Sequence, residues 1–81
     1  MDKEIKIYIQ GLMTEGTIVR EKTIVAYSQY SLLQKCLKAC LEIVQDIRVE
    51  TLVFIDAYDT EQYCDAKFFR EGEFERLTNN L

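Results

Sequence analysis

Apolar side chains recur at intervals of three and four residues between Leu33 and Ile47. This spacing places them in one stripe along an α-helix, with polar residues on the opposite side. A helix that is apolar on one side buries that side against another element, and a chain of 81 residues is large enough for one core only. We therefore predict a single domain, residues 1–81, in which a helix over residues 31–47 covers a sheet. The stripe consists of Leu33, Cys36, Leu37, Cys40, Leu41, Val44 and Ile47.

Two segments before the helix have the pattern of strands. Residues 4–10 place an isoleucine at every second position, which is typical of a strand with one buried face. Residues 17–27 are rich in β-branched side chains and are interrupted by charges. They predict either two strands with a turn near Glu21 and Lys22 or one long bent strand, in both cases antiparallel to its neighbour. Gly16 supplies the turn that precedes them.

Three further signals complete the predicted fold. Ser31 and Gln34 have the spacing of a capping box, which predicts that the helix begins at Ser31. Residues 51–55 are apolar without alternation, as in a central strand that is covered on both faces. A strand, a crossover helix and a second strand form a right-handed βαβ unit, so we expect this strand to run parallel to the first. We expect Asp59 to cap a short helix that extends to Phe69.

These elements together predict the class of the fold. We expect an α/β (α+β) domain with a three- or four-stranded mixed sheet, built from a hairpin and a βαβ unit. One long helix packs on this sheet. A short helix follows near the C-terminus.

The charged residues exclude some classes of function. The chain has 10 basic and 14 acidic residues, and the whole net charge of −4 arises in residues 56–81. A net negative charge opposes binding to a phosphate backbone, so we expect no direct nucleic-acid binding. The sequence has no run of about 18 apolar residues, and residues 1–4 lack an apolar signal region. We therefore expect a cytoplasmic, soluble protein without membrane contact.

The cysteines and the missing histidine bear on enzymatic chemistry. The chain has three cysteines and no histidine, which removes histidine-based acid–base catalysis and histidine-ligated metals. Cys36 and Cys40 lie one turn apart on the predicted helix, where side chains run parallel and bridge poorly, so we predict buried free thiols. We expect no metal, no cofactor and no cysteine nucleophile, because a low thiol pKa requires a neighbouring base or cation.

Asp56 is the most informative candidate for a catalytic group. It ends the apolar strand and is followed by Asp59, and ligands lie at the carboxyl end of central strands in open α/β sheets. The alternative is that both carboxylates end the strand and cap the following element. We favour this structural role and keep Asp56 and Asp59 as weak catalytic candidates.

A hairpin, a helix and then the strand Phe54-Ile55-Asp56-Ala57-Tyr58 resemble the N-terminal half of the ribonuclease H-like fold, in which this strand ends in an aspartate. The first strand, which ends in Gln10-Gly11, is similar to that family's strand ending in aspartate and glycine. The resemblance implies a cluster of carboxylates that holds two divalent ions. Gln10 stands where the first of these aspartates would be, and Leu33 or Gln34 where a helix glutamate would be. The resemblance therefore implies a truncated relative without nuclease activity.

Acidic and aromatic side chains are interleaved in the last third of the sequence. Interfaces favour aromatic anchors, and a negative field attracts a basic partner. We therefore predict a non-enzymatic protein-binding module whose partner has a basic surface. A modulator or inhibitor of a nucleic-acid-processing enzyme encoded on a mobile element is one version of this hypothesis. The residues assigned to the binding surface are Tyr58, Glu61, Tyr63, Phe69, Glu71, Glu73 and Glu75.

The sequence leaves two alternatives to this function open. Residues 17–27 form an edge that would pair with its copy across a two-fold axis, giving a homodimer or a homo-oligomeric structural protein. The charges of Arg20, Glu21 and Lys22 would, on the opposite interpretation, prevent that pairing. The other alternative is a degenerate ribonuclease H-like, metal-dependent nuclease that uses Asp56 and Asp59.

Overall fold

The computed structural model describes residues 3–72 and has an α+β fold, which confirms the predicted fold class. Glu73 and Glu75, which the sequence assigned to a binding surface, lie outside the described residues. The elements follow the chain in the order β1 (Ile5–Leu12), β2 (Ile18–Ala26), α1 (Gln29–Val44), β3 (Thr51–Ile55), β4 (Glu61–Asp65) and α2 (Ala66–Arg70).

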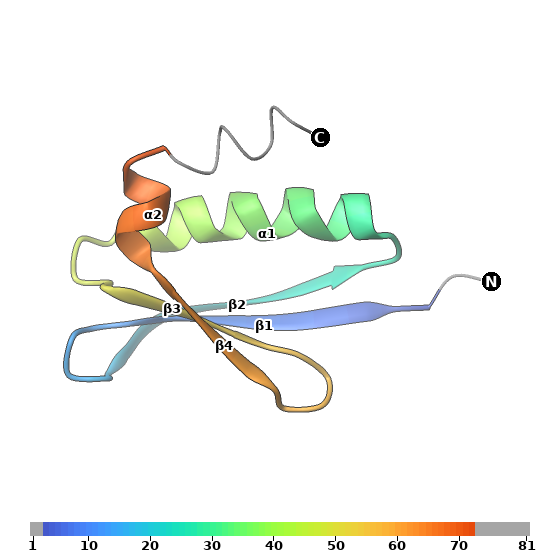
Figure 1. Ribbon diagram of the computed structural model, residues 1–81, viewed down its shortest axis with the longest axis horizontal. Coiled ribbons are helices and arrows are strands. Elements are labelled where there is room, and N and C mark those ends of the chain that lie inside the picture. Colours follow the sequence, from blue (N-terminus) through green and yellow to red (C-terminus); the bar gives the residue numbers. More distant parts are fainter. Residues whose placement is uncertain (1–2, 73–81) are drawn as a thin grey trace.

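The four strands form one sheet in the order β2-β1-β3-β4, and both helices cover the same face of it (Figure 1). Every neighbouring pair is antiparallel, so the prediction that β3 runs parallel to β1 is wrong. The reason is the hairpin that precedes the helix. Since α1 connects β2 to β3, the crossover makes those two strands parallel to each other, and β1 lies between them with the opposite direction.

The helix α1 begins earlier and ends earlier than the sequence pattern indicates. Its N-cap is Ser28, whose Oγ accepts a hydrogen bond from the backbone N–H of Ser31 at 3.1 Å. The predicted capping box at Ser31 is therefore wrong, because Ser28 supplies the same kind of oxygen one turn earlier. The helix ends at Val44, and Ile47 is 83% exposed beyond it.

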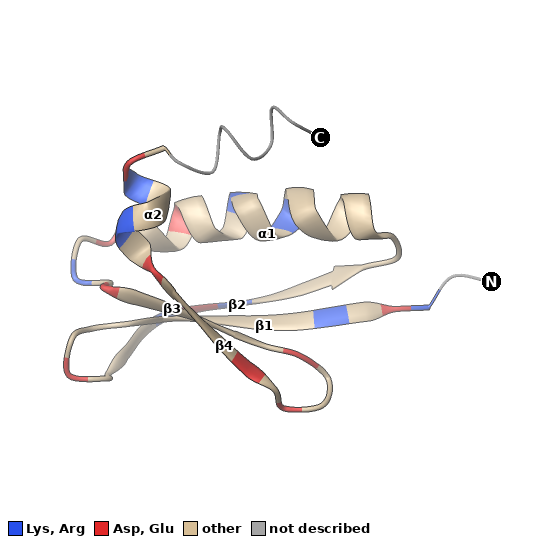
Figure 2. Ribbon diagram, viewed as in Figure 1, with Lys and Arg blue, Asp and Glu red and all other residues tan. Residues whose placement is uncertain are grey.

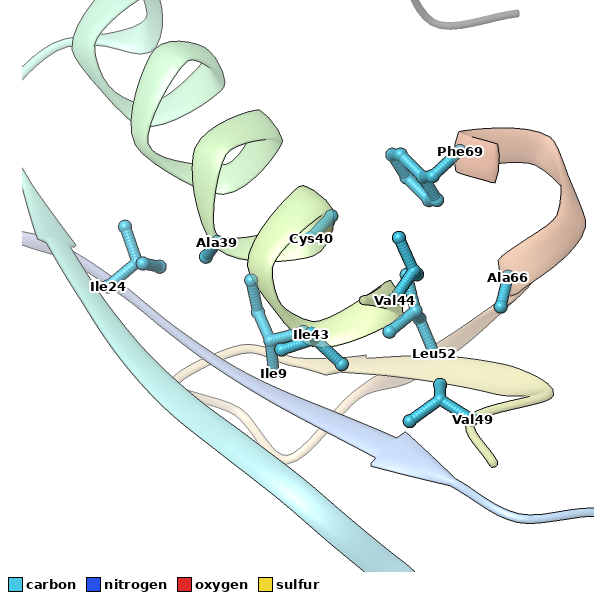
Figure 3. Packing of buried hydrophobic residues seen from close by; sticks show 10 residues of the cluster. All are labelled: Ile9, Ile24, Ala39, Cys40, Ile43, Val44, Val49, Leu52, Ala66 and Phe69. Carbon is cyan, nitrogen blue, oxygen red and sulfur yellow. The ribbon is translucent and has the colours of Figure 1, made fainter. Parts of the chain in front are cut away.

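The core lies between the two helices and the sheet (Figure 3). Ile9, Ile43 and Leu52 are fully buried there. A Cβ at Gly11 would lie 2.5 Å from Cγ2 of Ile43, so the absence of a side chain at this position lets the helix approach the sheet. The predicted stripe holds for Cys40 and Val44, but the buried side of α1 is turned further toward Ala39 and Ile43. Half-buried positions along α1 are Leu33, Cys36, Leu37 and Leu41.

The strands confirm two predictions and correct a third. Residues 17–27 contain one strand, β2, which continues through Glu21 and Lys22 and has a register shift opposite Gly11 and Leu12. The strand β3 is central, and Leu52 and Val53 are both buried although they are successive residues of a strand. The predicted short C-terminal helix is present as α2, but it begins at Ala66 with Asp65 as its N-cap, because residues 61–65 form the strand β4 instead.

Candidate functional site

The turn between β3 and β4 is organised by Asp56. Its Oδ1 accepts hydrogen bonds from the backbone N–H groups of Tyr58 at 2.9 Å and Thr60 at 3.0 Å. These bonds hold the chain in a tight turn in which Asp59 has a φ of 62°, a backbone conformation that aspartate tolerates better than most residues. The structure thus places the Asp56 carboxylate in the turn-forming role, and no helix begins at this turn.

The β3–β4 hairpin and its flanking residues carry only negative charge. The segment over residues 50–66 contains five acidic side chains and no lysine or arginine. Figure 2 shows the acidic positions along β4 and the turn that leads into it. A cationic group near β4 would therefore meet an attractive field, whereas at the turn Lys6 lines the same cavity as Asp56 and Asp59. The five acids are Glu50, Asp56, Asp59, Glu61 and Asp65.

Two tyrosines project among these carboxylates. Tyr58 is 89% exposed at the turn, and Tyr63 is 65% exposed on β4. The hydroxyl of Tyr63 donates a hydrogen bond to Oε2 of Glu61, and this bond raises the pKa of Tyr63. Exposed tyrosines have a large apolar area and a polar tip, which is why interfaces are enriched in them.

The structure brings together some of the predicted binding residues and separates others. Tyr58, Glu61 and Tyr63 lie on one hairpin. Phe69 is only 7% exposed and belongs to the core, so its assignment to a binding surface is corrected to a packing role. Glu71 follows α2, where its carboxylate lies 3.5 Å from Nζ of Lys67. We define the hairpin surface as Tyr58, Asp59, Glu61, Tyr63 and Asp65.

The hairpin surface includes an edge of the sheet that the sequence analysis missed. The hydrogen bonds from Asp56 N to Thr60 O and from Ala66 N to Glu50 O lie at the two ends of β4. They identify which residues of β4 are hydrogen-bonded to β3. In an antiparallel ladder, alternate residues bond to the partner strand. The backbone N–H and C=O groups of Glu61, Tyr63 and Asp65 therefore point away from β3, and within residues 3–72 no strand lies on that side of β4.

The other edge of the sheet, β2, is covered by side chains. The pairings of β3 with β1 and of β1 with β2 continue the same alternation of hydrogen bonds to the other edge. At β2 this alternation directs the backbone groups of Val25 outward. Nζ of Lys35, on α1, donates a hydrogen bond to the Val25 carbonyl at 2.7 Å. Lys22 forms an ion pair with Glu42 of the same helix. This edge is thus tied to α1.

An ion-pair cluster around Asp46 fastens the end of α1. The Asp46 side chain is 9% exposed and accepts hydrogen bonds from Arg48, which holds the pKa of this carboxyl well below its usual range. Arg20 of β2 lies 3.3 Å from the same carboxylate. The guanidinium of Arg70 donates to the backbone carbonyls of Val44 and Asp46 at 3.1 and 2.9 Å. These partners give the cluster a structural role, since it joins β2, α1 and α2.

The three thiols are free, and Cys40 is the most buried of them. Burial, with smaller contributions from Cys36 and Cys64, raises the pKa of Cys40 to about 12. Burial also raises the pKa of Cys36 and of Cys64. Thiols with raised pKa values are weak nucleophiles near neutral pH. In the part of the chain that the structure describes, no three His, Cys, Asp or Glu side chains are grouped so that they could hold a metal ion.

Comparisons with protein-family models, with curated proteins and with solved structures found no match for this chain. The ribonuclease H-like resemblance therefore stays a prediction. Among residues 3–72, neither helix is long and apolar enough to cross a membrane. The geometry of the hairpin surface is thus the observation from which a function can be argued.

Proposed function

We propose that this protein is a non-enzymatic protein-binding module and that its hairpin surface contacts a basic partner. The observation that carries this proposal is the pair of exposed tyrosines, Tyr58 and Tyr63, in a segment whose only charges are negative. Tyrosine anchors add contact area at low entropic cost, and the field of the carboxylates accelerates encounter with a cationic surface.

The chemistry of the partner follows from the sign of that field. Proteins that process nucleic acids carry basic surfaces, because they neutralise phosphates with lysine and arginine. We propose that this protein is a modulator or inhibitor of such an enzyme in the cytoplasm. The same proposal holds that the enzyme is encoded on a mobile element.

A nuclease function has less support. Two-metal catalysis needs several carboxylates that converge on the ions. Oδ1 of Asp56 already accepts two backbone hydrogen bonds, and Asp59 is part of the turn that these bonds form. The binding function is therefore the one that the geometry favours.

The test compares two double variants that change composition in the same way. Tyr58→Ala with Glu61→Lys alters the hairpin surface, whereas Tyr27→Ala with Glu15→Lys alters an exposed tyrosine and an exposed glutamate elsewhere. The probe is a fluorescein-labelled peptide of eight lysines, whose affinity is measured by fluorescence anisotropy at low salt. We expect the hairpin variant to bind several-fold more weakly than the control variant. Equal affinities of the two variants would refute a binding role of the hairpin surface.

A further inference from the structure

The outer edge of β4, which has no strand beside it within residues 3–72, carries acidic side chains at both ends. We propose that a basic, extended segment of the partner adds to β4 as a fifth, antiparallel strand of the sheet. This inference rests on the proposed function and specifies how the partner is held. The inference depends on which backbone groups of β4 point away from β3 and on the acidic side chains of the same strand.

The backbone of β4 is available for such an addition. Glu61 and Tyr63 direct their N–H and C=O groups away from β3, and Asp65 directs its N–H the same way, while its carbonyl accepts from Sγ of Cys64 at 3.6 Å. All three residues are exposed. Strand addition to an exposed sheet edge uses these main-chain groups for affinity and alternate side chains for specificity. An antiparallel orientation continues the pattern of all three existing ladders and is slightly more stable per residue than a parallel one.

The side chains of β4 determine what such a strand must carry. Because side chains alternate along a strand, Glu61, Tyr63 and Asp65 lie on one face of the sheet. In an antiparallel addition, every second residue of the new strand lies opposite one of these three. A lysine or arginine at those positions would face a carboxylate at either end and an aromatic ring between them, which are favourable cross-strand pairs. The expected recognition pattern is a basic residue at every second position.

The same charges exclude a second copy of this chain as the occupant. Two copies of β4 paired over their full length would place Glu61 of each opposite Asp65 of the other, and like charges directly opposite each other destabilise a ladder. The edge of β2 is no better as the added strand, because Lys35 already occupies the Val25 carbonyl. Charge complementarity therefore selects a basic segment of another protein.

The test uses two peptides that differ only in which backbone N–H groups can donate. Both alternate lysine with threonine over eight residues, four of each. One is N-methylated at the lysines and the other at the threonines. When the lysines lie opposite β4, their own N–H groups face it, so methylation of the lysines blocks the addition and methylation of the threonines leaves that edge of the peptide free. Charge and composition are the same in both.

We expect the peptide methylated at its lysines to bind roughly tenfold more weakly, since it loses several hydrogen bonds of ordinary strength. Amide hydrogen exchange should slow at Glu61, Tyr63 and Asp65 when the other peptide binds, and should stay unchanged at Gln62 and Cys64, which already face β3. Equal binding of both peptides, or protection that does not follow this alternation, would overturn strand addition.

The outcomes separate this inference from the proposed function. If both methylated peptides bind equally well and binding is lost in the variant with Tyr58→Ala and Glu61→Lys, the hairpin surface binds cations without strand addition. If neither these peptides nor the octalysine peptide binds, both proposals fail. If only the peptide methylated at its threonines binds well, both hold.

Discussion

The two edges of the sheet, β2 and β4, are treated differently by the same chain. At β2, Lys35 covers an outward carbonyl, and Arg20 and Lys22 are paired with acidic side chains from α1 and the loop after it. At β4, the outward backbone groups have no strand beside them within residues 3–72, and the charges of residues 50–66 are all negative. An unpaired edge is prone to pairing with another chain, and proteins protect such edges with charges, irregularities or covering side chains.

The difference follows from where the long helix lies. α1 packs mainly against β2, so its polar side chains reach the edge of that strand. α2 has five residues and lies between β4 and α1, with its basic residues beyond the acidic segment. One edge is therefore closed by a neighbouring element of the same chain, while the other is protected from its own copy, as far as residues 3–72 are concerned, by charge repulsion alone. Repulsion of this kind excludes acidic partners and admits basic ones.

The largest effect is expected from the packing that holds α1 over β1, the strand next to β2. Ile43→Ala should leave a cavity above Gly11 and lower the free energy of unfolding by about 2–5 kcal/mol, comparable with the whole stability of a small domain. Lys38→Ala, on the exposed side of α1, should change it by no more than about 0.5 kcal/mol. Urea titration measures both. Similar losses of stability in the two variants would mean that the Ile43 side of α1 is not what holds this helix on the sheet.

The next effect concerns pH and the β4 side of the core, where Cys40 lies near Cys64 of β4. A thiol with a pKa of about 12 in the fold and about 9 when unfolded stays neutral while the unfolded chain ionises. The unfolded state then binds fewer protons, so stability should fall as pH rises from about 9 to 12, by about 1.4 kcal/mol for each unit of pH at most. In Cys40→Ala this part of the decline should be missing, as urea midpoints across that range would show.

A smaller effect would sharpen the contrast between the edges directly. Lys35→Met keeps the apolar stem of the side chain but removes its bond to the Val25 carbonyl. We expect a loss of stability within about 1 kcal/mol, together with self-association that sedimentation detects at high protein concentration. If the variant sediments like the wild-type protein, the Lys35 contact is not what closes this edge. The predicted homodimer would then need another surface.

The smallest effect is expected at the open edge itself. Glu61→Gln removes the carboxylate that raises the pKa of Tyr63, so that pKa should move down toward the ordinary value for tyrosine. Absorbance titration at 295 nm would follow the change, with Tyr63→Phe identifying which tyrosine titrates. Because both side chains are exposed, the urea midpoint should not change measurably. A clear loss of stability would show that the hairpin depends on this bond.

The strands and the helix stripe could be predicted because their patterns are carried by side chains that enter the core. Ile9 and Leu52 belong to apolar patterns whose type of element was predicted correctly. The segment of β4 has no such pattern: it reads Glu-Gln-Tyr-Cys-Asp, and its strand conformation comes from pairing with β3, which lies elsewhere in the sequence. Because that pairing was missed, the open edge was missed with it.

The candidate site was predicted in part for the same reason. Tyr58, Glu61 and Tyr63 could be selected by chemistry alone, since acids and tyrosines together indicate an interface. Phe69 could not be assigned from the sequence, because an aromatic residue among charges fits either a surface or a core. Its burial depends on α2 packing against α1, a contact between distant parts of the chain.

Asp65 is both the last residue of β4 and the N-cap of α2, so the strand passes into the helix without a connecting residue. Its carboxylate accepts from the backbone N–H of Lys67 at 2.8 Å, while the next residue, Ala66, is still bonded to the strand side through Glu50. Because no flexible residue separates the two elements, a rotation of β4 about its own axis would also rotate α2. The twist of the outermost strand is thereby coupled to the packing of Phe69 in the helix layer.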